Sequence, residues 1–134
     1  MKLGQQKQLN RVNKMVETSY STATEAVTIA STTTGANATL VYTCPALHDA
    51  TVDLLHVANN NNSSKKIHLQ FYHQDDTTYH YILKNHTIAG NSAENVFGAG
   101  VLHLHAGDKI VAYGETTNTM EVLISCREFY SPNR

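Results

Sequence analysis

The stretch Ile67-His68-Leu69-Gln70-Phe71-Tyr72-His73 carries the pattern from which the fold class follows. Ile67, Leu69 and Phe71 are apolar, whereas the residues between them are polar or amphipathic. Side chains of an extended strand point alternately to opposite sides of a sheet. The stretch is therefore predicted to be a strand with one buried and one solvated face, as antiparallel sheets commonly have.

Turn residues flank this strand on both sides. The preceding segment, Asn59–Lys65, consists of four Asn, two Ser and one Lys, and Gln74-Asp75-Asp76 follows the strand. Alternation resumes in Thr78–Lys84, which predicts a hairpin. Further along, Ala106-Gly107-Asp108 is predicted to be a turn, and Glu115–Asn118 is predicted to close a last hairpin.

Short β-rich segments extend from Glu25 towards the end of the chain, with turn residues about every 8 to 12 positions. No amphipathic segment of helix length lies among them, which argues against parallel βαβ units. This spacing is typical of an antiparallel sandwich or barrel, and we predict an all-β domain, an antiparallel β-sandwich of jelly-roll-like form. The expected strands are Ala26–Ser31, Ala38–Thr43, Thr51–Ala58, Lys66–His73, Thr78–Lys84, His86–Ile88, Glu94–Phe97, Val101–His105, Lys109–Tyr113 and Met120–Phe129.

The first 24 residues differ from the rest in their hydrophobic pattern. Leu9, Val12 and Val16 stand at i, i+3 and i+7, a spacing that allows a short amphipathic helix, although such a helix alone would be marginal. The Ser- and Thr-rich stretch Thr18–Thr24 is interpreted as a linker. We therefore divide the chain into an N-terminal docking arm and linker, residues 1–24, and a β-sandwich domain, residues 25–134.

Charge is distributed unevenly between these two parts. Lys2, Lys7, Arg11 and Lys14 precede the first acidic residue, Glu17, whereas the later 120 residues hold all 11 acidic residues and only six of the 10 basic ones. A basic leader can be a docking arm for an acidic protein surface, a solvated end or a nucleic-acid tail. Nucleic acid is the least favoured partner, because the cations are few and no aromatic residue lies among them. The candidate docking residues are Lys2, Lys7, Leu9, Arg11, Val12, Lys14 and Val16.

Composition bounds the class of protein further. The chain has 134 residues, 41% hydrophobic and only 16% charged, so neutral Thr, Asn and Ser must supply much of its solubility. No apolar run approaches the roughly 18 residues of a membrane span, and the first residues lack the apolar core of a signal peptide. We expect a soluble protein with no membrane segment, made without secretion.

The two cysteines, Cys44 and Cys126, each lie in or beside an apolar segment and are expected to behave as small buried hydrophobes. A disulfide between them would need neighbouring strands and is disfavoured in a reducing cytoplasm. Asp49 and Asp53 could supply oxygen ligands to calcium together with residues 59–62, but the spacing matches no calcium loop, and a solvated hairpin is favoured.

Among the eight histidines, His103 and His105 are the sharpest metal candidates, because residues two apart on a strand point to the same side. Two imidazoles do not complete a zinc site, and no Asp, Glu or Cys stands two or four positions from the pair. His68 and His80 could join from neighbouring strands, or symmetry could bring copies of the pair together. We favour exposed histidines, no metal and no cofactor.

Catalytic patterns are missing from the sequence. There is no G-x-S-x-G, no glycine-rich phosphate loop and no H-E-x-x-H. Asp75 and Asp76 are the only adjacent acidic pair, and neighbouring side chains in a turn point apart rather than across a scissile bond. A non-enzymatic protein is therefore expected.

Two further patterns concern surfaces. Tyr79 and Tyr81 share one face of their strand, where they either pack against Phe71 or form a surface platform with Tyr72; packing is favoured. The segment Val52–Val57 is apolar on both faces, which predicts a second covered surface, supplied by a loop, the arm or another subunit.

The order of several motifs resembles that of small β-sandwich virion proteins of tailed bacteriophages, over roughly residues 25 to 130. The motifs are Tyr42-Thr43-Cys44-Pro45-Ala46, Leu54-Leu55-His56-Val57-Ala58-Asn59, Ile67-His68-Leu69-Gln70-Phe71-Tyr72, Tyr79-His80-Tyr81-Ile82-Leu83 and Leu104-His105-Ala106-Gly107-Asp108-Lys109-Ile110.

This resemblance implies a non-enzymatic structural protein located in the virion and assembled in the host cytoplasm. The role that it implies first is that of a capsid decoration (cement) protein, which contacts the major capsid protein through the arm. A neck, tail or fibre-base protein is the alternative within the class, and a glycan-binding β-sandwich module is the alternative outside it. By analogy with the resembled proteins, the oligomer is expected to be a homotrimer.

Overall fold

The computed structural model describes residues 20–98 and 100–132, which form nine strands and one short 3-10 helix. The strands are β1 (Tyr20–Thr28), β2 (Thr39–Thr43), β3 (His48–Asn59), β4 (Lys65–His73), β5 (Thr78–Ile88), β6 (Ser92–Asn95), β7 (Leu102–His105), β8 (Lys109–Gly114) and β9 (Met120–Tyr130), and the 3-10 helix η1 spans Gly35–Asn37. No helix of the described residues is long and apolar enough to cross a membrane.

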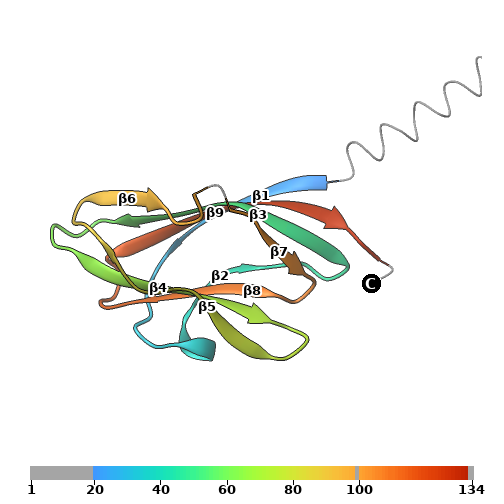
Figure 1. The fold of residues 1–134 in the computed structure, drawn as a ribbon, viewed down its shortest axis with the longest axis horizontal. Coiled ribbons are helices and arrows are strands. Elements are labelled where there is room, and N and C mark those ends of the chain that lie inside the picture. Colours follow the sequence, from blue (N-terminus) through green and yellow to red (C-terminus); the bar gives the residue numbers. More distant parts are fainter. Residues whose placement is uncertain (1–19, 99, 133–134) are drawn as a thin grey trace, which may run out of the picture.

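The strands form two sheets that face each other as the layers of a sandwich (Figure 1). The first sheet has the order β1-β9-β3-β6, with β7 also pairing with β3. The second sheet has the order β2-β8-β4-β5. Every pairing is antiparallel. The all-β, antiparallel sandwich predicted from alternation is confirmed.

The strand order is that of a jelly roll. β6 pairs with His56–Asn59 and β7 pairs with Asp49–Val52, so these two short strands share one position beside β3. Counted in this way, each sheet has four positions, and the chain passes repeatedly from one sheet to the other. Consecutive strands stay in one sheet only from β4 to β5 and from β6 to β7. This eight-position arrangement is the jelly-roll form of the sandwich.

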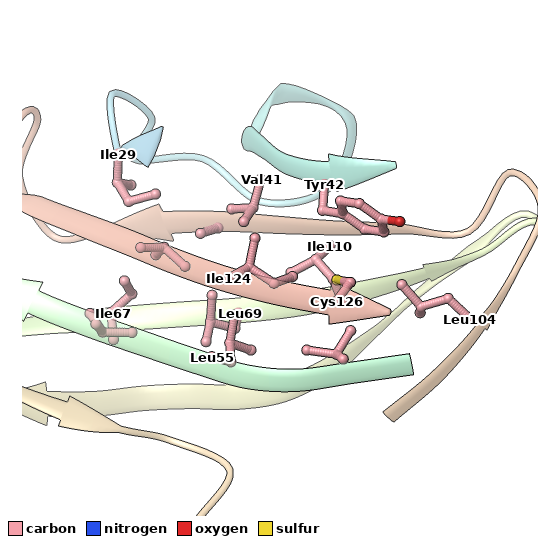
Figure 2. Close-up of a cluster of buried hydrophobic side chains, with 14 of the residues drawn as sticks. Ile29, Val41, Tyr42, Leu55, Ile67, Leu69, Leu104, Ile110, Ile124 and Cys126 are labelled. Carbon is pink, nitrogen blue, oxygen red and sulfur yellow. The ribbon is translucent and has the colours of Figure 1, made fainter. Parts of the chain in front are cut away.

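The core fills the space between the sheets, where side chains from both layers meet (Figure 2). Leu55 and Ile124 from the first sheet and Ile67, Leu69 and Ile110 from the second are fully buried. Each such side chain contributes about 1.5–3 kcal/mol relative to an exposed position. The inward positions of β4 are therefore those that alternation predicted.

A β-bulge in β3 explains the apolar residues on both faces of Val52–Val57. The register with β9 shifts between Val52 and Leu54, and the extra residue, Asp53, is exposed. Because one residue is inserted, Val52 and Leu55 both point into the core although they are three positions apart. The segment thus requires no second covered surface, and that inference from the sequence is corrected.

Two features also differ from those predicted. β1 begins at Tyr20, so residues 20–24, interpreted as part of a linker, pair with β9 instead. The two strands predicted over 78–88 are one strand, β5, which continues through Asn85 in the left-handed region at φ 55°. The arm-and-sandwich division remains a prediction, since residues 1–19 lie outside the described residues.

The segment Glu115–Asn118 is not a hairpin. It joins β8 in the second sheet to β9 in the first, and hydrogen bonds from Asn118 N to Ile29 O and from Glu115 N to Lys66 O attach it to both layers. Alternation gives the same signal for strands that pair side by side and for strands that face each other across the core, which is why the prediction was wrong.

Candidate functional site

The predicted docking residues cannot be placed. Lys2, Lys7, Leu9, Arg11, Val12, Lys14 and Val16, together with the predicted short helix, lie outside the described residues. The described chain begins at Tyr20, whose ring lies 5.7 Å, centroid to centroid, from that of Phe129 on β9. The described residues present three surfaces of interest: the histidine pair on β7, an aromatic layer on the second sheet, and a groove between β1 and β2.

His103 and His105 lie on the outer face of the first sheet, since Leu104 between them is fully buried in the core. His105 Nδ1 lies 3.2 Å from Asp49 Oδ1, and His103 Nδ1 lies 3.2 Å from Thr51 Oγ1. A shallow hollow of about 270 Å³ is lined by these four residues and Phe129, among others. The shared outward face predicted for the pair is confirmed.

The histidines offered as extra ligands do not join this pair. His68 and His80 belong to β4 and β5 of the second sheet, whereas His103 and His105 lie on the outer side of the first. His80 instead lies beside Asp76, with Nε2 3.4 Å from Oδ2. Within residues 20–98 and 100–132, no three or more His, Cys, Asp or Glu side chains are grouped so that they could hold a metal ion.

The candidate calcium ligands are spread along β3. Asp49 lies beside His105, and Asp53 accepts hydrogen bonds from Arg127 at 2.8 and 3.1 Å. Asn59, near the other end of the strand, donates from its amide to the carbonyls of Ser63 and Ile88, at 3.0 and 2.9 Å. The side-chain oxygen of Asn59 accepts the N–H of Asn61 at 2.9 Å, so Asn59 orders the polar loop.

Cys44 and Cys126 are free thiols in the core, each 1% exposed. The expectation that they behave as small buried hydrophobes is confirmed. Burial is the main cause that raises the pKa of each thiol to about 12, and neighbouring acidic groups add to the shift. Both side chains are therefore protonated and unreactive in the folded protein at neutral pH.

The tyrosines of the second sheet form a surface layer, so the favoured packing against Phe71 is wrong. Cross-strand partners share a face, and the partner of Phe71 is His80, whereas Tyr72 pairs with Tyr79. Phe71 consequently faces the core while Tyr79 and Tyr81 point outward. Tyr72 and Tyr79 have ring centroids 4.8 Å apart.

A second part of this layer centres on His68. Its ring stacks on that of Tyr113, with centroids 4.2 Å apart and planes 4° apart. The N–H of Asn85 donates to His68 Nδ1 at 3.1 Å, so the neutral ring carries its hydrogen on Nε2. Tyr113 also shares a hydroxyl–hydroxyl hydrogen bond of 2.6 Å with Tyr81. These contacts form an aromatic patch of His68, Tyr81 and Tyr113 across β4, β5 and β8. Gln70, which is buried and accepts hydrogen bonds from Thr34 and Gly35, separates it from the Tyr72–Tyr79 pair.

The electrostatics of this patch favour the neutral form of the His68 ring. Burial, followed by the positive charges of Lys84 and Lys66, lowers the pKa of His68. The ammonium of Lys84 lies 5.0 Å from the ring centroid of Tyr81, a cation–π distance. An uncharged stacked imidazole beside an accessible tyrosine is a surface suited to apolar faces and hydroxyl groups.

A groove runs between β1 and β2, the strands at one edge of each sheet. It encloses about 480 Å³ and is lined by Ala23, Glu25, Val27, Leu40, Val41, Tyr42, Thr43, Pro45 and Glu128. Leu40 is 51% exposed, and the hydroxyl of Tyr42 donates to the carboxylate of Glu128 across the groove. Sequence reasoning missed this feature because it depends on which strands end the two sheets; the alternate inward positions Ala23 and Val27 were its only local signal.

No family model matches the chain, and no curated protein matches it. Among solved structures, the chain is similar to a chain of Bacillus endospore appendages, described as a novel family of disulfide-linked pili, with 10% identity, 84% of this chain and 89% of that chain covered, and a TM-score of 0.49. It is also similar to part of the T13 IBDV viral particle, with 11% identity, 85% and 33% covered, and a TM-score of 0.46. A third is the globular domain of zebrafish complement 1qA protein, with 9% identity, 78% and 94% covered, and a TM-score of 0.43.

Proposed function

We propose that this protein is a non-enzymatic structural protein of a tailed-bacteriophage virion, in the first place a capsid decoration protein attached through its basic N-terminal leader. The same chemistry would serve a neck, tail or fibre-base protein. The order of its motifs, which resembles that of small virion β-sandwich proteins, supports the class. The trimer that this resemblance implies remains a prediction.

The observation that carries the proposal is that basic residues gather before the sandwich, whereas the sandwich itself is acidic. Four of the 10 basic residues precede Glu17, while the sandwich that follows holds an excess of acidic residues. A basic, largely polar segment joined to an acidic body suits attachment to an acidic protein surface, because opposite charges steer the encounter. The contacts that such an attachment makes must offset about 1–2 kcal/mol of backbone entropy for each residue that binding orders.

The position of the core supports the division into an attachment segment and a separately folded sandwich. Among residues 20–98 and 100–132, the buried cluster runs from Ile29 to Cys126, and Ala23 of β1 is the one earlier residue that packs against it. The first sheet is already completed by β1, which begins at Tyr20. Removing residues 1–18 should therefore leave the sandwich intact while removing the attachment segment.

The test compares binding of three proteins to particles that lack the native protein. These are the full chain, the chain without residues 1–18, and a full chain with Lys2, Lys7, Arg11 and Lys14 changed to Glu. Both altered proteins should unfold at the concentration of urea that unfolds the full chain, yet fail to cosediment with particles. A Lys65→Glu, Lys66→Glu control changes charge on the sandwich only and should still bind. Cosedimentation of the truncated chain at full-length affinity would refute docking through the leader.

Copy number distinguishes the locations within the virion. Quantitative mass spectrometry of purified particles should give hundreds of copies for a decoration protein, whereas about a dozen or fewer would indicate the neck or tail, whose rings have few subunits. Absence of the protein from particles would contradict the virion class altogether.

A second candidate function, glycan binding, is favoured by the aromatic patch on the outer face of the second sheet. Tyr81 is 42% exposed and lies beside the stacked pair of His68 and Tyr113. Aromatic rings that present an apolar face with hydroxyl groups at the rim can stack on sugars. A glycan-array signal lost in Tyr81→Ala and kept in Tyr20→Ala, a matched exposed tyrosine on the first sheet, would support this function; unchanged binding in both would exclude the patch as the site.

A further inference from the structure

The four sheet edges of the sandwich are protected to different degrees. Native proteins blunt exposed edges by keeping them short, charging them or interrupting them with bulges. The edge strands β6 and β7 have four residues each, β2 has five residues and a bulge between Leu40 and Tyr42, and β5 has two register irregularities and carries Lys84. Three of the four edges are thus poor templates for another strand.

β1 is the exception. It is nine residues long, Tyr-Ser-Thr-Ala-Thr-Glu-Ala-Val-Thr, and its register with β9 runs from Tyr20 to Thr28 without a shift. Glu25 is its single charged residue, and it contains no proline. Among the described residues, nothing pairs with its outer edge. A long, regular, nearly uncharged edge of Thr, Ala and Val is well suited to add another strand.

The hydrogen-bond pattern identifies which groups this edge offers. Ile29 N donates to Met120 O at 2.8 Å, which makes Ile29 a residue bonded to β9. Antiparallel ladders alternate, so Val27, Glu25 and the other odd-numbered residues of β1 also bond to β9. The even-numbered residues therefore direct their N–H and C=O groups to the open edge. They are Tyr20, Thr22, Thr24, Ala26 and Thr28.

We propose that β1 pairs with β1 of a second copy of this chain, antiparallel and about a twofold axis at Thr24. In this register Thr24 faces Thr24 of the partner subunit, and each even-numbered residue meets another whose backbone groups are also free. Pairing along the whole strand forms about ten backbone hydrogen bonds, the number that an interface of standard size carries. The first sheet of one copy and the first sheet of the other then form one continuous sheet.

Side-chain chemistry favours this register over its neighbours. With the axis at Thr24, Thr hydroxyls meet on the outer face and Glu25 lies opposite Ala23 of the partner subunit. Moving the axis by one residue, to Glu25, would place two carboxylates directly opposite each other, which is destabilising. On the inner side, the grooves that contain Val27 and the half-exposed Leu40 would face each other and cover apolar surface that a single copy leaves open to water.

The pairing uses only described residues and does not depend on the leader or on the virion function. It gives a dimer, whereas the resemblance implies a trimer. A closed trimer needs one surface to contact a different surface on its neighbour, which a self-complementary strand pair does not provide. A measurement of the oligomeric state therefore distinguishes the dimer formed through β1 from the trimer that the resemblance implies.

The first experiment measures the mass of the full chain in solution by light scattering, together with Thr24→Lys and Thr117→Lys. Thr24→Lys places two ammonium groups side by side at the axis, and we expect it to weaken the dimer about 5-fold. Thr117→Lys makes the same charge change in an exposed loop and should leave the dimer intact. A monomer or trimer for the unaltered chain, or a dimer that Thr24→Lys does not weaken, would overturn the proposal.

The second experiment tests the register. Residues directly opposite in a hydrogen-bonded antiparallel pair have Cα atoms about 5.5 Å apart, within disulfide range. Thr24→Cys should therefore give a covalent dimer on mild oxidation, because the two native cysteines are buried and do not compete. Thr28→Cys should not cross-link to itself, since its partner in this register is residue 20. Cross-linking of Thr28→Cys but not of Thr24→Cys would refute the twofold axis at Thr24.

Discussion

The imidazole of His68 and the phenol ring of Tyr113 lie face to face, 4.2 Å apart between centroids and 4° from parallel. The stack joins β4 to β8 on the outer face of the second sheet. His68 Nδ1 also accepts the N–H of Asn85, at the point where β5 takes a left-handed residue. This hydrogen bond needs an unprotonated Nδ1 and is lost when the ring is protonated, so the patch is sensitive to pH.

The pKa of His68 in the folded protein should lie below the ordinary value of 6.5, because burial and two lysines disfavour its cation. The unfolded chain then binds more protons, so the free energy of unfolding should fall as pH drops from about 6.5 through the folded-state pKa. NMR titration of the ring checks the pKa directly. His68→Gln should remove this part of the pH dependence, and a ring that titrates above 6.5 would contradict the prediction.

Asp76 should contribute to stability only when it is ionised. Its pKa is lowered to about 2, chiefly by a hydrogen bond from the Thr78 hydroxyl, with smaller contributions from the Thr78 N–H, His80 and His73. Since the folded-state pKa is depressed from 3.8, this contribution is fully present above about pH 4 and is lost as pH falls through 2. Urea unfolding of Asp76→Asn should therefore differ from the parent at pH 6 and converge with it near pH 2. Asp75→Asn, which changes the adjacent carboxylate, is the control.

Asp108 should be among the most sensitive polar residues. It is 2% exposed, and its two carboxylate oxygens accept the N–H groups of Gln74 and His105, at 2.9 and 2.8 Å. Asp108→Asn keeps the shape but replaces one acceptor with a donor, which leaves a buried N–H unpaired. We expect a loss of about 2–3 kcal/mol in the free energy of unfolding. Glu121→Gln, a carboxylate on β9, should change stability by less than about 0.5 kcal/mol; equal effects would contradict the role given to Asp108.

The thiols of Cys44 and Cys126 should react with a disulfide reagent only when the protein unfolds. Both are buried, and burial raises the pKa of each to about 12, so little thiolate forms at pH 7. Labelling in native buffer should be slow and should accelerate to the rate of an exposed thiol in urea. An exposed cysteine introduced at Thr117 provides the reference rate. Rapid labelling of the unaltered native protein would show that the core opens readily.

The sandwich could be predicted from sequence because its signal is local. In β4 the inward residues Ile67, Leu69 and Phe71 alternate with outward ones, and the turns beside them carry Asn, Ser and Asp. The hairpin from β4 to β5 followed from the same signal, since its two strands are adjacent both in sequence and in the sheet.

What could not be predicted depends on partners that are distant in sequence. The bulge at Asp53 is defined by its register with β9, more than 70 positions later, and only that register tells which face Leu54 occupies. Tyr79 was assigned to the wrong face because the register of β5 against β4 decides whether it opposes Phe71 or Tyr72. Tyr20–Thr24 resembled a linker because an edge strand with one half-buried residue in this stretch has almost no hydrophobic pattern.

The position of β9 also affects how the molecule can be made. This last strand, Met120–Tyr130, lies between β1 and β3, so it supplies the partner of the earliest described strand, with Tyr20 opposite Phe129. A nascent chain on the ribosome cannot complete the first sheet until its final strand has emerged. The first sheet therefore stays unclosed until β9 has emerged, and the edges of β1 and β3 remain open to chaperones or to other nascent chains until then.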